Sequence, residues 1–421
     1  MDLLFLHQNF PAQFAHLAPA LAQAGHRVTA LTGRAGKPQT WRGIRVLPYR
    51  HDWPQAAHLH PWLTTMNAAV ERGTAAMRAM LALKSRGYSP DAVIAHPGWG
   101  EALFLRDVWP QARIGLYCEY WYRATGADVG FDPEFGGPQE FGAAQRIRLK
   151  NLPQRLQLDM ADAALSPTGW QADTYPPADR ARITVAFDGI DTDAIRPDPA
   201  ARLTLNGRSW TRDDEVITFV NRNLEPYRGF HVFMRALPDL LQRRPAAQVI
   251  VVGGDGISYG MPPPGGGTWR QTMLAELDSR LSPADLARLH FVGRLGRADF
   301  TRLLQISRVH VYLTYPFVLS WSLIEAMSAG CAIVASDTVP VAEVIENGRT
   351  GLLCGFFDGA GLVDRIDTLC RDAALRDRLG AAARTAVRAR HDLAKVCLPA
   401  QMRWVETLSA GCRPRAIAAR G

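Results

Sequence analysis

Short apolar runs alternate with longer stretches of helical periodicity along most of the chain. An apolar run at residues 2–7 is followed by a helical pattern at 10–24 and a second apolar run at 27–32. Short buried strands separated by helices predict parallel α/β sheets, because each crossover helix returns the chain to the same end of the sheet. The other expected strands are 44–49, 91–95, 113–118, 163–166, 216–221, 248–252, 290–292, 309–313 and 332–336; the long expected helices include 61–86, 139–160, 360–371, 373–390 and 393–408.

The same strand–helix rhythm occurs on both sides of a proline-containing stretch. Pro197 and Pro199 mark this stretch as a linker. A chain of 421 residues is long enough for two or three domains with sizeable cores. We therefore predict an N-terminal domain over 1–198 and a second parallel-sheet domain over 199–392.

The most informative segment is residues 309–353. A strand at 309–313, a loop at 314–320, a helix at 321–329 and a strand at 332–336 form a βαβ unit. Open parallel sheets bind ligands beyond the carboxyl ends of their strands, against helix N-termini. Glu325 is the one carboxylate in this otherwise apolar helix start. A solvated helix position is the ordinary explanation, but apolar neighbours predict burial, and a buried carboxylate needs a polar partner or ligand.

The sequence EAMSAGCAIVASD, followed by Glu343, Gly348 and GLL, resembles the donor-site signature of family 4 glycosyltransferases. The resemblance implies retaining enzymes that use nucleotide sugars and have the GT-B fold, an α/β architecture of two Rossmann-like parallel-sheet domains facing a cleft. It implies that Glu325 holds the ribose hydroxyls. It also implies that the last helix, about 393–410, crosses back to the first domain. The family usually has a second glutamate at position 317, where this chain has Phe317.

Phe317 leaves two alternatives for the donor sugar. It could face a sugar with fewer hydroxyls, or it could turn inward as core. In the second case the backbone amides of Val318, Leu319 and Ser320 would hold an ordinary hexose, because amides ahead of a helix need no particular side chain.

Two arginines are expected to hold the donor pyrophosphate. Arg222 and Arg228 stand between a strand and a helix that starts near Phe230, which suits an anion, although two plain surface arginines are the alternative. The resemblance places the family's arginine and lysine at these two positions. It also assigns the base edge to the backbone at Val292 and Arg294.

The loop after the first strand carries no G-x-G-x-x-G, which argues against a dinucleotide-dependent oxidoreductase. The family brings a backbone amide to the donor phosphate at this place, which is Asn9 and Phe10 here. His96 follows the strand at 91–95, and the resemblance implies that it faces the reacting sugar near its O6. The alternative is a histidine that caps the loop.

Residues 119–134 combine aromatic rings with carboxylates, a combination that suits sugars. We assign Glu119, Trp121 and Asp128 to the acceptor side; a solvated acidic loop is the alternative.

The formal charge of +8 and the pI of about 9.4 fit an anionic ligand, an anionic membrane surface or nucleic acid. We find no nucleic-acid motif. The basic helix at 139–160 leaves peripheral contact with an anionic membrane open, although a solvated face is the more usual explanation. Absence of a signal sequence, of a long apolar run and of C-x-x-C motifs predicts a cytoplasmic protein with reduced thiols. A peripheral position at the inner face of the cell membrane is left open.

The histidines at 51, 58 and 60 lack a convincing fourth ligand, so we predict no metal site. No cofactor is expected, because arginines supply the cationic groups.

The predicted activity is transfer of a sugar from a UDP- or GDP-sugar to a hydroxyl of a glycan, glycolipid or small molecule. The expected role of this activity is in the assembly of a glycan, a lipid or a cell-surface polysaccharide. A non-catalytic sugar-nucleotide binder and a natural-product glycosyltransferase are the alternatives. A pyridoxal-type phosphorylase is disfavoured, because the stretch 294–350 has no lysine for a Schiff base.

Overall fold

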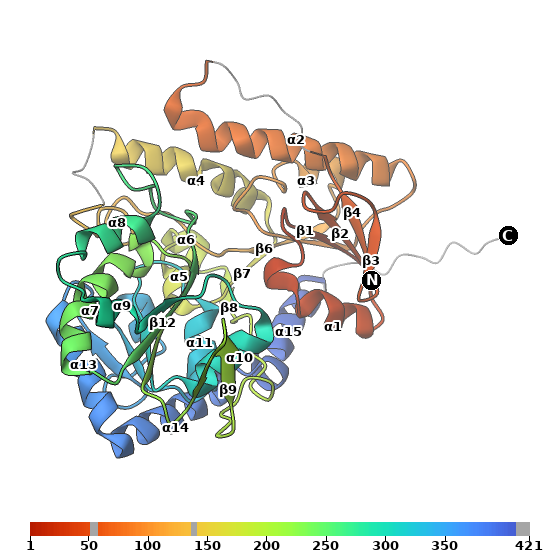
Figure 1. Cartoon of the computed structure of the whole chain (residues 1–421). Helices are drawn as coiled ribbons and strands as arrows, with labels where there is room; N and C mark the ends of the chain where they lie inside the picture. The colour runs from red at the N-terminus through yellow and green to blue at the C-terminus, as the bar shows by residue number, and fades with distance from the viewer. Residues whose placement is uncertain (51–57, 136–140, 410–421) are drawn as a thin grey trace. The chain divides into compact units, whose positions relative to one another are not determined.

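The computed structural model describes residues 1–50, 58–135 and 141–409. His51, one of the three histidines considered for a metal site, and the C-terminal tail 412–421 lie outside these residues. The chain divides into two compact units, shown in Figure 1. Unit 1 is Met1–Ala124, Gln139–Asp188 and Ala394–Gly421, and unit 2 is Thr125–Pro138 and Gly189–Leu393. The chain thus enters unit 2 at 189 rather than 199, and residues 125–138 also belong to unit 2.

Unit 1 is built on an eight-stranded sheet with the order β3-β4-β2-β1-β5-β6-β7-β8. All neighbouring strands are parallel except β3 and β4, and β1 is paired on both sides, with Leu3 opposite Val28 and Ala92. The strands are β1 (Asp2–Leu6), β2 (Arg27–Thr32), β3 (Gln39–Trp41), β4 (Ile44–Pro48), β5 (Ala92–Ala95), β6 (Arg113–Tyr117), β7 (Ala163–Ser166) and β8 (Ile183–Val185).

Helices cover this sheet, and α2 and α4 pack against each other (Figure 1). The helix expected at 10–24 is instead a 3-10 turn, Ala12–Phe14, followed by α1 (Leu17–Gln23). Pro19 explains the late start of α1, because proline is tolerated only in the first turn of a helix. The other helices are α2 (Thr64–Lys84, after a 3-10 turn at Pro61–Leu63), α3 (Leu105–Val108), α4 (Ala143–Met160), α5 (Gly169–Asp173), α6 (Pro177–Arg180) and α15 (Leu398–Ser409).

The last helix, α15, packs on β6 and α1 of unit 1. Trp404, Val405 and Leu408 are buried there in the same core cluster as β1. Gly115 permits this close approach, because a Cβ atom at that position would lie 2.6 Å from the Trp404 ring. A glycine in the middle of β6 therefore sets how closely the C-terminal helix approaches the sheet.

Unit 2 contains a six-stranded, fully parallel sheet with the order β13-β12-β11-β14-β15-β16. Its strands are β11 (Val216–Asn223), β12 (Gln248–Gly254), β13 (Leu289–Phe291), β14 (Val309–Tyr312), β15 (Ile333–Ser336) and β16 (Leu352–Cys354). Its helices are α7 (Phe230–Arg243, after a 3-10 turn at Pro226–Arg228), α8 (Trp269–Glu276), α9 (Pro283–Leu286), α10 (Arg297–Ile306), α11 (Trp321–Ser328), α12 (Val339–Ala342), α13 (Gly359–Arg371) and α14 (Ala373–Arg390); a π-helical turn, Leu393–Cys397, precedes α15.

An antiparallel hairpin, β9 (Arg202–Leu205) and β10 (Arg208–Thr211), precedes this sheet and was not predicted. Its turn is Asn206–Gly207, and both residues have positive φ, 51° and 77°. Asn-Gly is the commonest signal for such a two-residue turn, so the sequence did contain the information needed to predict the hairpin.

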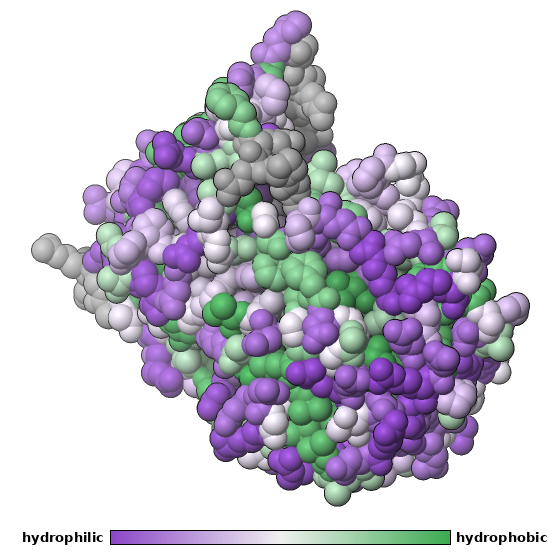
Figure 2. All heavy atoms as spheres, turned by 90° about the vertical axis from the view of Figure 1, so that its left-hand side faces the viewer, coloured by the Kyte–Doolittle hydropathy of each residue, from purple (hydrophilic) through white to green (hydrophobic). Residues whose placement is uncertain are grey.

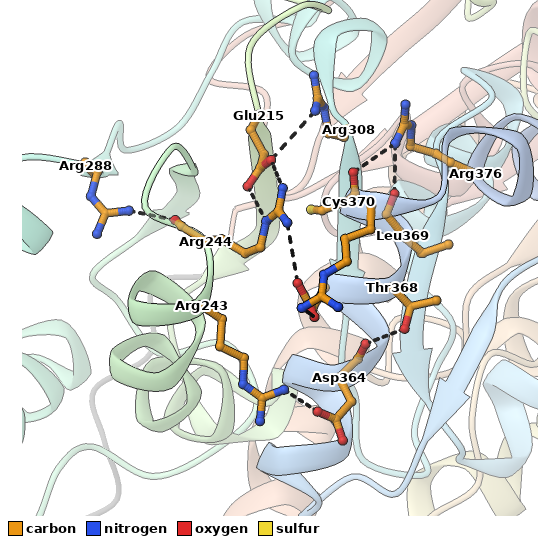
Figure 3. A network of polar contacts seen from close by, with 12 residues as sticks. Glu215, Arg243, Arg244, Arg288, Arg308, Asp364, Thr368, Leu369, Cys370 and Arg376 are labelled. Atoms are coloured by element: carbon orange, nitrogen blue, oxygen red, sulfur yellow. Dashed lines mark hydrogen bonds and ion pairs between the residues drawn. The ribbon is translucent and has the colours of Figure 1, made fainter.

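A network of charged residues joins the amino ends of the unit 2 strands to its helices (Figure 3). Glu215, directly before β11, accepts hydrogen bonds from two nitrogens of Arg244, and Arg308 lies 3.7 Å from the same carboxylate. Arg244 also lies 3.5 Å from Asp367 of α13. Arg288 donates to the Arg244 carbonyl oxygen at 2.9 Å. Cations are thus paired with acids or carbonyl oxygens at this edge of the sheet.

The face of the molecule in Figure 2 mixes hydrophilic and hydrophobic residues, with green side chains in small groups among purple ones. Individual apolar side chains are exposed, among them Phe141, Met261 and Val339. In the part of the chain that the structure describes, no helix is both long and apolar enough to cross a membrane.

Candidate functional site

A pocket of about 400 Å³ lies at the carboxyl edge of the unit 2 sheet. The ends of β11 and β12, the segment after β13 and the start of α11 form it. Parallel strands end at one edge and crossover helices begin there, so segments far apart in sequence meet at this place. The lining residues are Val220, Asn221, Arg222, Val252, Arg294, Leu295, Phe300, Ser320, Trp321, Ser322 and Glu325.

Glu325 is a buried carboxylate in this pocket, with 5% of its surface exposed. Its Oε1 accepts a hydrogen bond from Nη1 of Arg297, a residue that the sequence reasoning missed. Burial raises the pKa of Glu325 above its ordinary value, and the charge and hydrogen bond of Arg297 act in the opposite direction. The Arg297 side chain is itself 62% exposed, so the partner of this carboxylate is solvated and a ligand can replace it.

Two further arginines line the pocket. Arg222, near the end of β11, is exposed and forms no ion pair within the described ranges. Arg294 donates from Nη2 to Oδ1 of Asn223 at 2.9 Å, which orients its guanidinium at the end of β11. Two cations and one replaceable carboxylate therefore face one cavity, an arrangement suited to a ligand with both phosphate and hydroxyl groups.

Arg228 does not line the pocket. It is 6% exposed, and its Nη1 donates to Thr314 Oγ1 at 2.8 Å and to the Val318 carbonyl oxygen at 3.0 Å. Its guanidinium also lies over the rings of Tyr259 and Phe317, at 5.3 and 5.7 Å from their centroids. The structure thus gives Arg228 a definite task, which is to hold the loop before α11 in place.

Phe317 lies within an aromatic cluster. It is 3% exposed, and its ring meets those of Tyr227 and Tyr259 edge-on, at centroid distances of 5.2 and 4.9 Å. Of the two alternatives left by the sequence, this position corresponds to the ring turned into the core.

The other predicted donor residues divide between pocket and core. Ser320 lines the pocket and caps α11, but its amide donates to the Tyr312 hydroxyl at 3.0 Å and so already has a partner. Val318 and Leu319 are buried. Val292 packs against the hydrophobic cluster behind the pocket, and its amide donates to the β12 backbone.

The Pro/Gly-rich loop over 258–268 is held in place by Glu225. This carboxylate is 1% exposed and accepts hydrogen bonds from the amides of Ser258, Tyr259 and Gly260 at 3.0–3.3 Å. Glu225 was not singled out from the sequence, because its only signal is a charged residue between Leu224 and Pro226.

A second polar cluster lies at the carboxyl edge of the unit 1 sheet. His7, His96 and Glu119 follow β1, β5 and β6, which are adjacent strands. His96 Nε2 lies 3.4 Å from Glu119 Oε2, and Gln13 donates to Glu119 Oε1 at 2.9 Å. The His96 ring stacks on Trp99 at 4.3 Å. Short loops after neighbouring strands thus bring together residues that are 89 and 23 positions apart.

Burial and charge set the protonation of this cluster. Burial, together with the nearby His96, lowers the pKa of His7 to about 3. Burial acts to raise the pKa of Glu119, but the hydrogen bond and charge of His96 and the hydrogen bond from Gln13 outweigh it and hold that pKa below its ordinary value. His7 is therefore neutral and Glu119 ionised near neutral pH. His7 was missed in the sequence, where it reads as the end of an apolar strand.

The remaining predicted residues do not meet at one place. Asn9 is exposed, whereas the Phe10 side chain is buried against Phe5 and Trp41. Trp121 is half-buried beside Tyr175 in unit 1. Asp128 belongs to unit 2, where it accepts a hydrogen bond from the Tyr227 hydroxyl. The acceptor residues assigned from one sequence stretch thus fall in two different units.

The solvated-loop alternative does not describe residues 125–135 either. Asp132 is 1% exposed and lies 3.2 Å from His231, and it also accepts from the Tyr315 hydroxyl at 2.5 Å. Glu134 binds Arg235 through both carboxylate oxygens at 2.6 and 2.7 Å. The carboxylates of this segment hold it against unit 2.

Two family models match the chain: "Glycosyl transferase family 4 group" over residues 24–195 and "Glycosyl transferases group 1" over residues 206–386. The chain is 28% identical over 230 residues to the D-inositol 3-phosphate glycosyltransferase of Streptomyces avermitilis, covering 53% of this chain and 47% of that protein. It is 24% identical over 389 residues to the glycogen synthase of Mycobacterium tuberculosis, covering 88% and 84%. The chain thus spans about half the length of the first of these relatives.

Solved structures show the same fold. Sucrose-phosphate synthase from Thermosynechococcus elongatus has a TM-score of 0.73 at 17% identity, covering 97% of this chain and 100% of that one. HepE from Anabaena, solved in complex with UDP-glucose, has a TM-score of 0.65 at 16% identity, with the same coverage. The fold is GT-B. The chain belongs to the family 4 glycosyltransferases of bacteria.

Proposed function

We propose that this protein is a retaining glycosyltransferase that moves a sugar from a UDP- or GDP-sugar to a hydroxyl of its acceptor. The observation that carries the proposal is the unit 2 pocket, which combines Arg222, Arg294 and the buried Glu325 in about 400 Å³. A nucleotide sugar has the matching groups: a diphosphate for the arginines and ribose hydroxyls for the carboxylate. HepE, a neighbour in fold, was solved with UDP-glucose, which makes UDP-sugars the first donors to test.

Each residue has a separate task in the proposed reaction. Glu325 exchanges its hydrogen bond from Arg297 for ribose hydroxyls. Arg222 stabilises the charge that grows on the leaving diphosphate, which is usually the largest kind of catalytic effect. The acceptor oxygen bonds to the anomeric carbon as the bond to the diphosphate breaks, and a donor phosphate oxygen takes the hydroxyl proton.

Arg228 acts on this site through the loop that it holds. Its bond to the Val318 carbonyl oxygen fixes the backbone two residues before the Ser320 cap of α11. We therefore treat Arg228 as a positioning residue as well as a candidate cation for the diphosphate. His96, beside Glu119 in unit 1, is the proposed contact to the transferred sugar.

Membrane contact is a weaker part of the proposal. Of the cations on α4, Lys150 lies 3.4 Å above the Tyr122 ring, and Arg155 pairs with Asp159 and Asp179. Paired cations attract lipid phosphates less than free ones. A cytoplasmic location and peripheral contact with anionic lipid both stay predictions.

A thermal-shift panel of UDP-, GDP-, ADP- and dTDP-sugars tests donor binding. A ligand at a hundred times its Kd stabilises the folded state by about 2.7 kcal/mol. We expect one base to stabilise the wild type and Glu325→Gln to lose most of that shift. If no nucleotide sugar shifts the melting temperature, the donor-site proposal is wrong.

A non-catalytic nucleotide-sugar binder is the second candidate, favoured by Phe317 at a position where the family usually has an acid. Release of nucleoside diphosphate that requires both donor and acceptor would exclude it. NMR of the product tests retention, because a retaining enzyme gives a product with the anomeric configuration of the donor.

A further inference from the structure

Unit 1 contains a second pocket, which the proposed donor site does not use. It measures about 560 Å³, within the range of roughly 300–1,000 Å³ typical of small-molecule sites. Loops after β1, β2 and β4, which are neighbouring parallel strands, form it together with α2. The lining residues are Gln8, Asn9, Gly33, Arg34, Ala35, Gly36, Tyr49, Arg50 and Arg72.

Three of these residues are arginines, and none is an acid. Within the described ranges, the guanidinium groups of Arg34, Arg50 and Arg72 form no ion pair. Like charges gathered around one cavity repel one another, and an anion that enters relieves this repulsion. Three arginines that line one pocket and form no ion pair with any described residue are therefore better explained by an anionic ligand than by stability.

Side-chain hydrogen bonds fix the residues that form the floor of the pocket. The Tyr49 hydroxyl donates to Glu101 Oε1 at 2.7 Å, and Glu101 is fully buried. Burial raises the pKa of Glu101, and the charge of Arg72 acts on it in the opposite direction. Thr32 joins two loops, because its hydroxyl donates to the Gln8 carbonyl oxygen at 2.7 Å and accepts from the Arg34 amide at 3.2 Å.

Two glycines, Gly33 and Gly36, form part of the rim of the pocket. A Cβ atom at Gly33 would lie 3.1 Å from the Tyr49 hydroxyl oxygen, so a side chain there would press on the ring that forms the floor. Gly36 has open space around it. Gln8 and Asn9 also line the pocket, and their side-chain amides can donate to and accept from a polar ligand.

We propose that this arginine pocket (Arg34, Arg50 and Arg72) binds a phosphate monoester carried by a polyhydroxylated acceptor. A phosphate monoester has about two negative charges and three terminal oxygens, which three guanidinium groups can engage together, whereas a carboxylate has one charge and two oxygens. The neutral amides would meet the hydroxyls. That the bound molecule is the acceptor rests on the proposed function; that the pocket binds a phosphate monoester does not.

Isothermal titration of the full-length chain with glucose 6-phosphate, glucose, glucuronate and inorganic phosphate tests this site. We expect glucose 6-phosphate to bind, glucose to give no signal, and glucuronate to bind at least tenfold more weakly. Arg50→Gln and Arg72→Gln should each weaken glucose 6-phosphate about tenfold or more, as expected for loss of a hydrogen bond to a charged group. Vesicles containing phosphatidic acid, a monoester lipid, show whether the same arginines take a lipid headgroup.

Arg45→Gln is the matched control. Arg45 is an exposed arginine near the start of β4, whereas Arg50 follows the end of the same strand and lines the pocket. The control should bind glucose 6-phosphate like the wild type. Equal weakening by Arg45→Gln, equal affinity for glucose and glucose 6-phosphate, tighter binding of glucuronate, or no binding of any phosphate monoester would overturn the proposal.

Glu325→Gln separates this proposal from the donor-site proposal. It should lose UDP-sugar binding and keep glucose 6-phosphate binding, and Arg50→Gln should do the reverse. If Glu325→Gln also abolished glucose 6-phosphate binding, the monoester would be bound at the donor pocket and the unit 1 site would be wrong. Loss of UDP-sugar binding alone says nothing against the arginine pocket.

Discussion

Arg222, at the carboxyl edge of the unit 2 sheet, differs in its pairing from the arginines at the amino edge. At the amino edge, Glu215 pairs with Arg244 and Arg308, and Arg244 also reaches Asp367 (Figure 3). At the carboxyl edge, Arg222 faces the pocket without an ion pair within the described ranges. Charges that serve stability are paired within the protein, because an uncompensated buried charge is costly. A cation left unpaired in a pocket is instead available to a ligand. Three of the four predictions below test this contrast, and the other concerns buried histidines.

The largest expected loss of stability is at the amino edge. Glu215→Ala removes the partner of the partly buried Arg244 and should lower the free energy of unfolding by about 3 kcal/mol. Chemical denaturation measures this, and the Kd for the donor nucleotide should stay within a factor of two. Glu346→Gln, whose partner Arg349 is exposed, is the control and should change stability by less than about 0.5 kcal/mol. A large change in donor affinity in Glu215→Ala would show that the two edges are not separate.

Arg228→Ala should lower both the stability of the fold and the rate of turnover. It leaves the Thr314 hydroxyl and the Val318 carbonyl oxygen without their donor, at a cost of about 2–3 kcal/mol in unfolding free energy, and turnover should fall by one to two decades. Arg228→Lys should recover part of both. Wild-type turnover with lowered stability would mean that Arg228 serves the loop alone.

Buried histidines should make the protein less stable in mild acid. The pKa of His7 is lowered to about 3 in the fold, whereas an unfolded histidine has a pKa near 6.5. The unfolded state therefore binds more protons between pH 6.5 and 3, and stability falls as pH drops through this window. At pH 5 the loss is roughly 2 kcal/mol for His7.

Unfolding curves at pH 7 and pH 5 test this effect. His7→Gln should reduce the difference between the two curves by about 2 kcal/mol. His310 and His391, with pKa values lowered to about 4, should act in the same direction. An unchanged difference in His7→Gln would contradict the prediction. If the carboxyl edge of unit 1 is functional, the same variant should also lose activity at pH 7.

Arg222→Gln should show the smallest effect on stability and a clear effect on binding. Because Arg222 is exposed and forms no ion pair among the residues that the structure describes, the melting temperature should stay within about 1 °C of the wild type. The Kd for the donor should rise about tenfold or more, as for loss of a hydrogen bond to a charged group. Unchanged affinity would remove Arg222 from the donor site and weaken the contrast between the two edges.

Sequence by itself determined the parallel α/β class, most strands and single residues of the unit 2 pocket such as Arg222, Arg294 and Glu325, because these depend on local signals. A short hydrophobic run predicts a strand from its own residues alone. Glu325 and Arg222 come after predicted strands, in segments whose sequence can be recognised. The GT-B fold that the motif implied is the fold of the chain. Even the missed β9–β10 hairpin had its Asn-Gly signal.

Tertiary structure decided which side chains share a site. His7, His96 and Glu119 meet because β1, β5 and β6 are neighbours in the sheet, and strand order is not written in any local stretch. Asp128 lies in unit 2 although its sequence neighbours at 119–124 lie in unit 1. In unit 2 its carboxylate accepts a hydrogen bond from the Tyr227 hydroxyl. Arg34, Arg50 and Arg72 look like ordinary surface arginines in the sequence. They become one pocket only when three strand ends and a helix come together, because charge density depends on distance in space and not along the chain.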